Sequence, residues 1–310
     1  MKKNCEAPVL LIAFNRPDTT KEAFESIRKV KPEKLYVAID GPRFDKQGEV
    51  ELCKQVVKIT KKVDWKCETK YLIREKNVGC KYGVSGAISW ALENEDRVIV
   101  IEDDIIPVPS FFYFVEELLE KYKNEDRIAM ISGNNYTPLD NMNVDYTFSK
   151  YGHIWGWATW KRVWDKFDVE IPEIHQEINS NLSKMSFINK KEQRYYNKYF
   201  KKLASKIIEK TENTWDSQFA FFRNQNNLLS IVPKFNLCSN IGEISSRTDT
   251  VASSNDFYYP SNDSYVLEKH PSKVTCNLEY DTYHFKKHID SKSFLEKVFY
   301  KLKLKLKIKN

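Results

Sequence analysis

Four apolar strands alternate with helical segments within the first hundred residues, and no other feature restricts the possible folds as strongly. The first run, 8–14, has the near-continuous hydrophobicity of a strand buried on both faces, the second also reads as buried, and all four have the length of a strand. The expected strands span 8–14, 35–39, 70–73 and 97–101, and the expected helices between them span about 19–30, 46–63 and 83–93. This repeat predicts an α/β fold with a mostly parallel, Rossmann-like sheet and helices on both of its faces.

Polar side chains follow three of these strands. They are Asn15 and Arg16 after the first strand, Asp40 after the second, and Glu102, Asp103 and Asp104 after the fourth. Sheets of this kind bind ligands outside the carboxyl ends of their strands. Lys76 and Asn77 form a turn at the same edge, and this turn either faces a ligand or only leads into the next helix. The pattern predicts a ligand site at this edge.

Adjacent carboxylates at the end of a strand suit a hard divalent cation such as Mn²⁺ or Mg²⁺, which prefers oxygen ligands. The alternative for Glu102-Asp103-Asp104 is a solvated turn. The motifs of competing nucleotide and phosphate chemistries are missing. The chain contains no GxxxxGK[ST] loop of a P-loop ATPase and no DxDx[TV] motif of a phosphatase, and the turn directly after its first strand lacks the glycines of a dinucleotide-binding domain. A cation held at the strand end, bridging to a diphosphate, therefore remains the favoured interpretation.

Four stretches, in sequence order, resemble GT-A glycosyltransferases, and most closely the inverting N-acetylglucosaminyltransferase I family with its bacterial relatives. They are 9–16 (VLLIAFNR), 38–41 (AIDG), 98–104 (VIVIEDD) with Pro107 and the phenylalanines after it, and 152–164 with Thr214-Trp215-Asp216. The likeness covers roughly residues 8–250. It implies a GT-A fold, a nucleotide-diphosphate sugar as donor, and Mn²⁺ or Mg²⁺ as cofactor.

The resemblance also implies roles for single residues. Asp104 would bind the metal, Glu102 and Asp103 would meet sugar or ribose hydroxyls, and Asp40 would accept a hydrogen bond from the uracil. Arg16, with Asn15 beside it, would contact a base carbonyl or a phosphate, and Lys76 and Asn77 would face the nucleotide. For Asp40 a turn before Gly41-Pro42 is an equally good explanation, and Arg16 has an ordinary surface arginine as its alternative.

Asp216 is the expected catalytic base. An inverting transfer needs a carboxylate that takes the proton of the acceptor hydroxyl, and the neighbouring Trp215 would form an apolar wall beside it. The alternative is an N-cap for the helix that begins after Asp216. Trp155, Trp157 and Trp215 are expected to contact the acceptor sugar, with core packing as the competing explanation.

The combined prediction is an inverting hexosyl- or N-acetylhexosaminyltransferase that uses a UDP-sugar in surface polysaccharide biosynthesis. Residues 1–115 would bind nucleotide and metal, residues 116–290 would bind a glycan acceptor, lipid-linked or free, and residues 291–310 would form a basic tail. Two alternatives stay open. One is a nucleotidyltransferase acting on sugar phosphates, and the other is a non-catalytic carbohydrate-binding protein.

Charge and cysteine usage indicate the compartment and the partners. The net charge of +7 is too evenly spread to indicate nucleic acid, and the six cysteines form no CxxC pair. We therefore expect a cytoplasmic protein with reduced thiols. Apolar residues recur among lysines in 294–310, which predicts a basic amphipathic helix lying on the inner face of the cytoplasmic membrane. A helix docked on the domain is the alternative.

Overall fold

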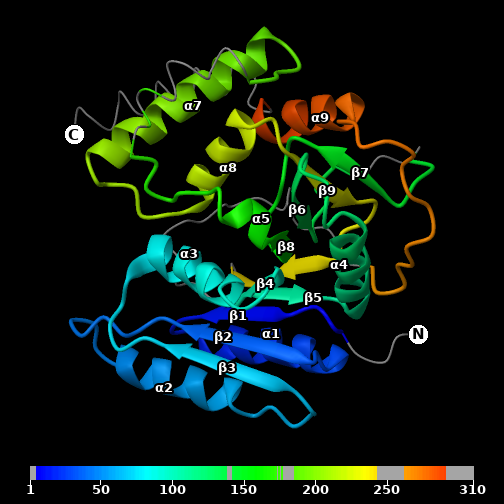
Figure 1. Cartoon of the computed structure of the whole chain (residues 1–310). Helices are drawn as coiled ribbons and strands as arrows, with labels where there is room; N and C mark the ends of the chain where they lie inside the picture. The colour runs from blue at the N-terminus through cyan, green and yellow to red at the C-terminus, as the bar shows by residue number, and fades with distance from the viewer. Residues whose placement is uncertain are drawn as a thin grey trace.

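The computed structural model describes residues 5–137, 142–172, 174, 176, 185–242 and 262–290. An eight-stranded sheet forms its centre (Figure 1). In sheet order the strands are β3 (Glu68–Ile73), β2 (Lys34–Ile39), β1 (Val9–Ala13), β4 (Arg97–Glu102), β8 (Trp157–Trp160), β6 (Ile128–Ser132), β9 (Leu229–Pro233) and β7 (Tyr146–Ser149). β8 and β7 are antiparallel to their neighbours, whereas the other six strands share one direction. The predicted α/β fold with a mostly parallel sheet is confirmed.

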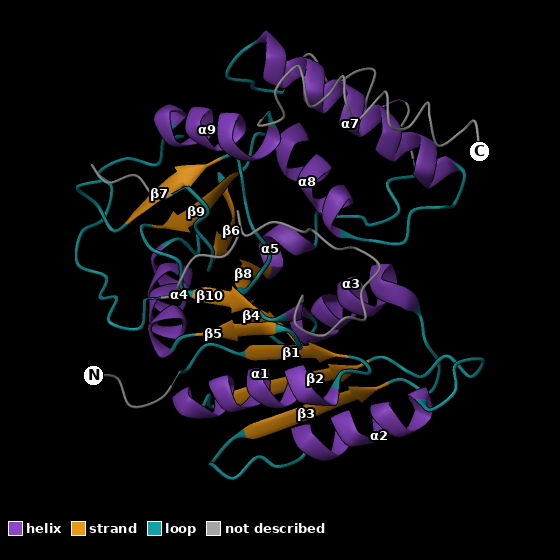
Figure 2. Ribbon diagram, turned by 180° about the vertical axis from the view of Figure 1, so that it is seen from behind, coloured by secondary structure: helices purple, strands orange, loops and turns teal. Residues whose placement is uncertain are grey.

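Helices flank the sheet (Figure 2). They are α1 (Pro17–Val30), α2 (Glu49–Thr60), α3 (Gly79–Leu92), α4 (Pro109–Lys121), α5 (Lys161–Trp164), α7 (Lys190–Ile208), α8 (Asp216–Gln225), α9 (Leu278–His284) and the π-helical turn η3 (Phe285–Ile289). The chain moves outward from β1 to β3 and then returns to β4 beside β1. Because crossovers between parallel strands are right-handed, this reversal places α3 on the face opposite α1 and α2.

The first four strands form where the sequence predicts them, and the apolar residues of β1, β2 and β4 are buried, whereas β3, at the edge of the sheet, is only partly covered. β1 is buried throughout, and so is β4 apart from its first and last residues. α2 begins later than expected, since Gly48 before it has φ of +80°, outside the helical region. In the described residues no helix is long and apolar enough to cross a membrane.

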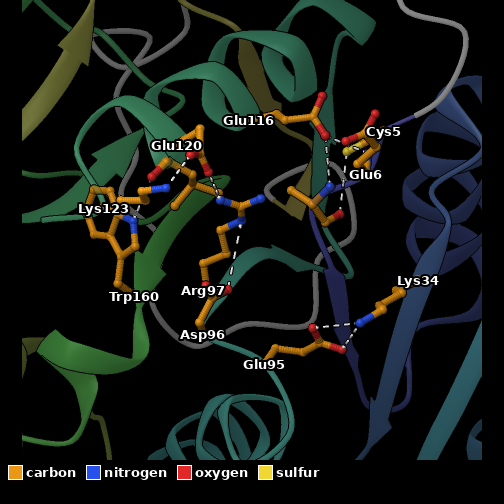
Figure 3. A network of polar contacts seen from close by, with 12 residues as sticks. Cys5, Glu6, Lys34, Glu95, Asp96, Arg97, Glu116, Glu120, Lys123 and Trp160 are labelled. Atoms are coloured by element: carbon orange, nitrogen blue, oxygen red, sulfur yellow. Dashed lines mark hydrogen bonds and ion pairs between the residues drawn. The ribbon is translucent and has the colours of Figure 1, made fainter.

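A network of ion pairs and hydrogen bonds at the amino ends of the strands connects the strands to the helices (Figure 3). Lys34 pairs with Glu95 at 2.9 Å, and Arg97 pairs with Glu120 at 2.7 Å. Glu116 on α4 accepts a hydrogen bond of 2.9 Å from the backbone N–H of Ala7, just before β1. These charges therefore tie strands and helices together at the sheet edge opposite the predicted site.

A small second sheet was not predicted from the sequence. β5 (Ile105–Pro107) pairs antiparallel with β10 (Cys238–Asn240), with Asn240 opposite Ile105. The pairing brings a segment more than a hundred residues downstream beside the acidic triplet.

Candidate functional site

Strand register gathers the predicted polar residues at one edge of the sheet. Ala13 pairs with Ile39 in the β1–β2 ladder, and Ile12 pairs with Glu102 in the β1–β4 ladder. The turns that follow β1, β2 and β4 therefore leave the sheet side by side. These turns carry Asn15 and Arg16, then Asp40, and then Asp103 and Asp104. In the same region Asn15 donates a hydrogen bond of 2.8 Å to the buried Glu49.

Arg16 is the cation of this edge. Its guanidinium forms ion pairs with both Asp103 and Asp104, the latter at 3.0 Å from Nη1 to Oδ2. Asp103 is buried and also accepts a hydrogen bond of 3.3 Å from the backbone N–H of Phe14. Burial opposes the charge of Arg16, but the two carboxylates outweigh it and keep its pKa above the ordinary value. The turn after β1 is thereby held against the acidic triplet.

Glu102 lies in a concentration of negative charge. Burial, followed by the charges of Asp104 and Asp103 and, more weakly, of Asp216, raises its pKa to about 8, while Arg16 acts in the opposite direction. Burial also raises the pKa of Asp103, to about 6, although Arg16 lowers it. Among the described residues only Arg16 forms ion pairs with the triplet, so its three carboxylates outnumber their cationic partner, which suits a further cation.

The pKa of Cys80, at the start of α3, responds to three carboxylates that are far apart in the sequence. The Cys80 residue is exposed, but neighbouring protein atoms partly desolvate its thiol, and this desolvation, followed by the charges of Glu102, Asp216 and Asp40, raises the Cys80 pKa to about 12. These carboxylates come from the ends of β4 and β2 and from the first residue of α8. The structure thus brings the predicted base to the same edge as the acidic triplet.

Asp216 reaches this edge because the loop before α8 is fastened to α3. The backbone N–H of Lys81 donates to the Asn213 carbonyl at 2.9 Å, and the Lys81 ammonium pairs with Glu170 at 2.9 Å. Asp216 is exposed and is the first helical residue, with Trp215 in the N-cap position and no side-chain capping bond. The N-cap alternative for Asp216 is therefore not what the structure shows.

Asp40 is buried and fastens the turn after β3. One carboxylate oxygen accepts from the backbone N–H groups of Gly41 at 2.9 Å and Val78 at 3.1 Å, and the other accepts from the Asn77 amide at 2.9 Å. Burial raises the Asp40 pKa, and these backbone bonds oppose the shift. The turn-forming role is thus present, while contact of Asp40, Lys76 or Asn77 with a nucleobase stays a prediction.

Gly41→Ala should disrupt this turn. A Cβ at residue 41 would lie 2.4 Å from the backbone N and C of Lys76, so the backbone must shift. We expect a loss of about 1–3 kcal/mol in the free energy of unfolding, measured by denaturant titration, and weaker UDP binding. Gly83→Ala is the control, because its Cβ would meet Asp40 at an ordinary 3.5 Å. Equal stability of the two variants would contradict the close approach.

The three tryptophans predicted to contact the acceptor differ in how deeply they are buried. Trp157 and Trp215 are 0% and 2% exposed and stack on each other with ring centroids 5.5 Å apart. Neither ring offers a free face to a sugar, so core packing, the competing explanation, describes both. Trp155 is only partly buried, beside Tyr136 at 5.4 Å, and it remains the acceptor candidate.

The segment after β10 lies against Asp104. The backbone N–H of Ile241 donates to the Asp104 carbonyl at 2.9 Å, and a Cβ at Gly242 would stand 2.4 Å from the Asp104 carboxylate. Only glycine allows this approach. Sequence reasoning missed the contact because it depends on the β5–β10 pairing.

The residues present fit a divalent cation held mainly by its substrate. No group of three or more metal-ligating side chains occurs in the described part of the chain. Mg²⁺-type sites, however, often use one or two protein carboxylates and take their other ligands from phosphates and water. The Asp104 side chain is 17% exposed and suits this arrangement, in which a cation would share it with Arg16.

A cavity of about 610 Å³ opens at the other end of the sheet, near the starts of β6 and β9. It is bordered by Arg162, Phe221 and Leu228 among others, and by none of the predicted site residues. The candidate site is consequently the carboxyl edge and not this cavity.

No protein-family model and no curated protein sequence matches the chain. Solved structures match it at low similarity. UDP-glucose pyrophosphorylase complexed with UDP-glucose is 11% identical, with 74% of this chain and 90% of that chain covered and a TM-score of 0.35. Apo mouse xyloside xylosyltransferase 1 is 10% identical, with coverages of 72% and 83% and a TM-score of 0.35. Similarity at this level assigns no reaction to the chain.

Proposed function

We propose that the protein is a metal-dependent, inverting glycosyltransferase that moves a sugar from a UDP-sugar to a glycan acceptor of a surface polysaccharide. One observation carries the proposal. The triplet follows β4 at the carboxyl edge where parallel sheets bind ligands, and the loop before Asp216 is bonded to the start of α3 at the same edge, where the Lys81 N–H donates to the Asn213 carbonyl at 2.9 Å.

The acidic triplet suits the leaving group. Asp104 would hold Mn²⁺ or Mg²⁺, and the cation would offset the negative charge that develops on the departing diphosphate. Arg16 would supply a second positive charge at the same edge, because a guanidinium matches planar oxyanions. Glu102 and Asp103 would accept hydrogen bonds from sugar or ribose hydroxyls.

Asp216 suits the acceptor. It is exposed, and in the described structure its carboxylate caps no helix. A carboxylate placed near the acceptor hydroxyl takes its proton as the hydroxyl attacks the anomeric carbon. Trp155 would contact the acceptor from the partly buried segment before β8.

Nucleotidyl transfer to a sugar phosphate is the second candidate. It shares strand-end carboxylates with glycosyl transfer but ordinarily uses a glycine-rich, basic loop after the first strand. The chain has Phe14-Asn15-Arg16-Pro17 there, and the Phe14 N–H is already bonded to Asp103. A protein that only binds carbohydrate has no need of Asp216 near the triplet.

A panel of nucleotide sugars tests the proposal. The full chain is incubated with UDP-, GDP- and CMP-sugars, each with Mn²⁺ and with EDTA, and the nucleotide products are separated. We expect slow release of UDP from one UDP-sugar, dependent on Mn²⁺. Release of a nucleoside triphosphate on addition of pyrophosphate would indicate nucleotidyl transfer. Glycan binding without turnover of any donor would indicate a binding protein.

A further inference from the structure

α7 concentrates positive charge. Residues 190–210 contain eight lysines and arginines against two glutamates, a net charge of +6. One of the two acids, Glu192, is buried and accepts a hydrogen bond from Tyr151. The Glu192 carboxylate therefore points into the protein and does not neutralise the cations on the outer surface of α7.

The basic residues form one face of the helix. α7 buries Phe200, Leu203 and Ala204 against the domain. Five exposed cations recur at steps of one, three and four residues on the outer side, namely Lys190, Arg194, Lys198, Lys201 and Lys202. Lys191 pairs with Asp290 and Lys206 with Glu212. Among the described residues none of those five has a carboxylate partner, so the ion pairs of the fold do not explain them.

The position of α7 makes this face an outer surface. The helix lies at one end of the molecule and α2 at the other (Figures 1 and 2). Tyr195 and Ile208 flank the cations and are 41% and 49% exposed. Asp290, the last described residue, lies beside Lys191, and the sequence beyond it adds seven lysines and one glutamate. The described surface on this side is therefore basic, with amphipathic and apolar side chains beside the cations.

We propose that the exposed basic face of α7 docks the protein on an anionic lipid bilayer. A nineteen-residue helix is roughly 28 Å long, and its row of cations matches an extended anionic surface better than a compact ligand. Exposed tyrosine and isoleucine suit the bilayer interface, where amphipathic and apolar side chains gain contact. The docking does not depend on the proposed reaction.

Charge reversal on the full-length chain tests the docking. One variant replaces four cations of α7 with glutamate, and a control replaces four exposed lysines in and directly after α2 with glutamate, so both lose the same charge. The α7 set is Arg194, Lys198, Lys201 and Lys202, and the α2-side set is Lys54, Lys58, Lys61 and Lys62. Co-sedimentation compares vesicles of phosphatidylcholine alone with vesicles that also contain phosphatidylserine, at low and at physiological salt.

We expect the native chain to bind only phosphatidylserine vesicles, more weakly as salt rises. The α7 variant should bind at least about tenfold more weakly than the α2 control, and glutamine at the same four positions should give an intermediate loss. Equal losses in the two variants would assign binding to net charge alone. Undiminished binding of the α7 variant would assign it to other residues. If soluble heparin bound the native chain as tightly as the phosphatidylserine vesicles do, the partner would be a soluble polyanion and not a bilayer. Each of these results, or no vesicle binding by the native chain, overturns the proposal.

Discussion

Asp216→Asn is expected to lower the rate of sugar transfer by about 10²–10⁴-fold, the usual contribution of general acid–base catalysis. Asparagine keeps the size of the side chain but cannot take a proton. Because Asp216 is exposed and caps no helix in the described structure, its replacement should leave folding unchanged. Transfer is measured by UDP release with a saturating donor and a glycan acceptor, and donor affinity by calorimetry.

The informative result is a fall in kcat with an unchanged Kd for the donor, because the interaction lost is made only in the transition state. Asp168→Asn is the control, since it removes one exposed carboxylate at the distant cavity. Normal turnover by the Asp216 variant would assign the base to another group. A weakened donor Kd would instead indicate that Asp216 acts on binding through its charge near Glu102.

The strands of the nucleotide half were predictable because their signal is local. The run of residues 98–101, Val-Ile-Val-Ile, is apolar at successive positions, which is typical of a strand buried on both faces. Parallel pairing then dictates that Asp40 and Asp104 leave the same edge. For this reason the candidate site could be located from the sequence although none of its contacts could.

The contacts themselves depend on pairings that are distant in sequence. Arg16 meets Asp103 across 87 residues, and Asp40 meets Asn77 across 37. The Gly242 approach to Asp104 requires β10 to pair with β5. Local patterns carry no information on such pairings. Tryptophan burial has the same origin, since Trp157 packs against Trp215 and Phe219, which follow it by more than fifty residues.

The predicted tail, residues 294–310, lies outside the described residues. Its expected membrane contact stays a prediction. The last described residue, Asp290, pairs with Lys191 of α7, so the described chain ends at the basic face of α7.

Asp104→Asn is expected to weaken Mn²⁺-dependent UDP binding by about a hundredfold or more, because a metal–carboxylate contact contributes several kcal/mol where charge must be offset. The chain should still fold. Asp103, the buried partner of Arg16 and of the Phe14 N–H, keeps the turn after β1 in place, whereas the Asp104 side chain is partly exposed. Calorimetric titration of UDP with Mn²⁺ and with EDTA separates metal-dependent from metal-independent affinity.

Replacing Asp103 and replacing Asp104 are expected to have different effects, and comparing the two variants tests the metal site more sharply than either variant alone. Asp103→Asn removes a buried charge that Arg16 and a backbone N–H both use, so thermal unfolding should report its loss. Asp104→Asn should leave the melting temperature nearly unchanged while removing the Mn²⁺ dependence of UDP binding. If the Asp104 variant kept that dependence, the cation would be held elsewhere. Arg16 would then be the positive charge that the diphosphate meets at the end of β4.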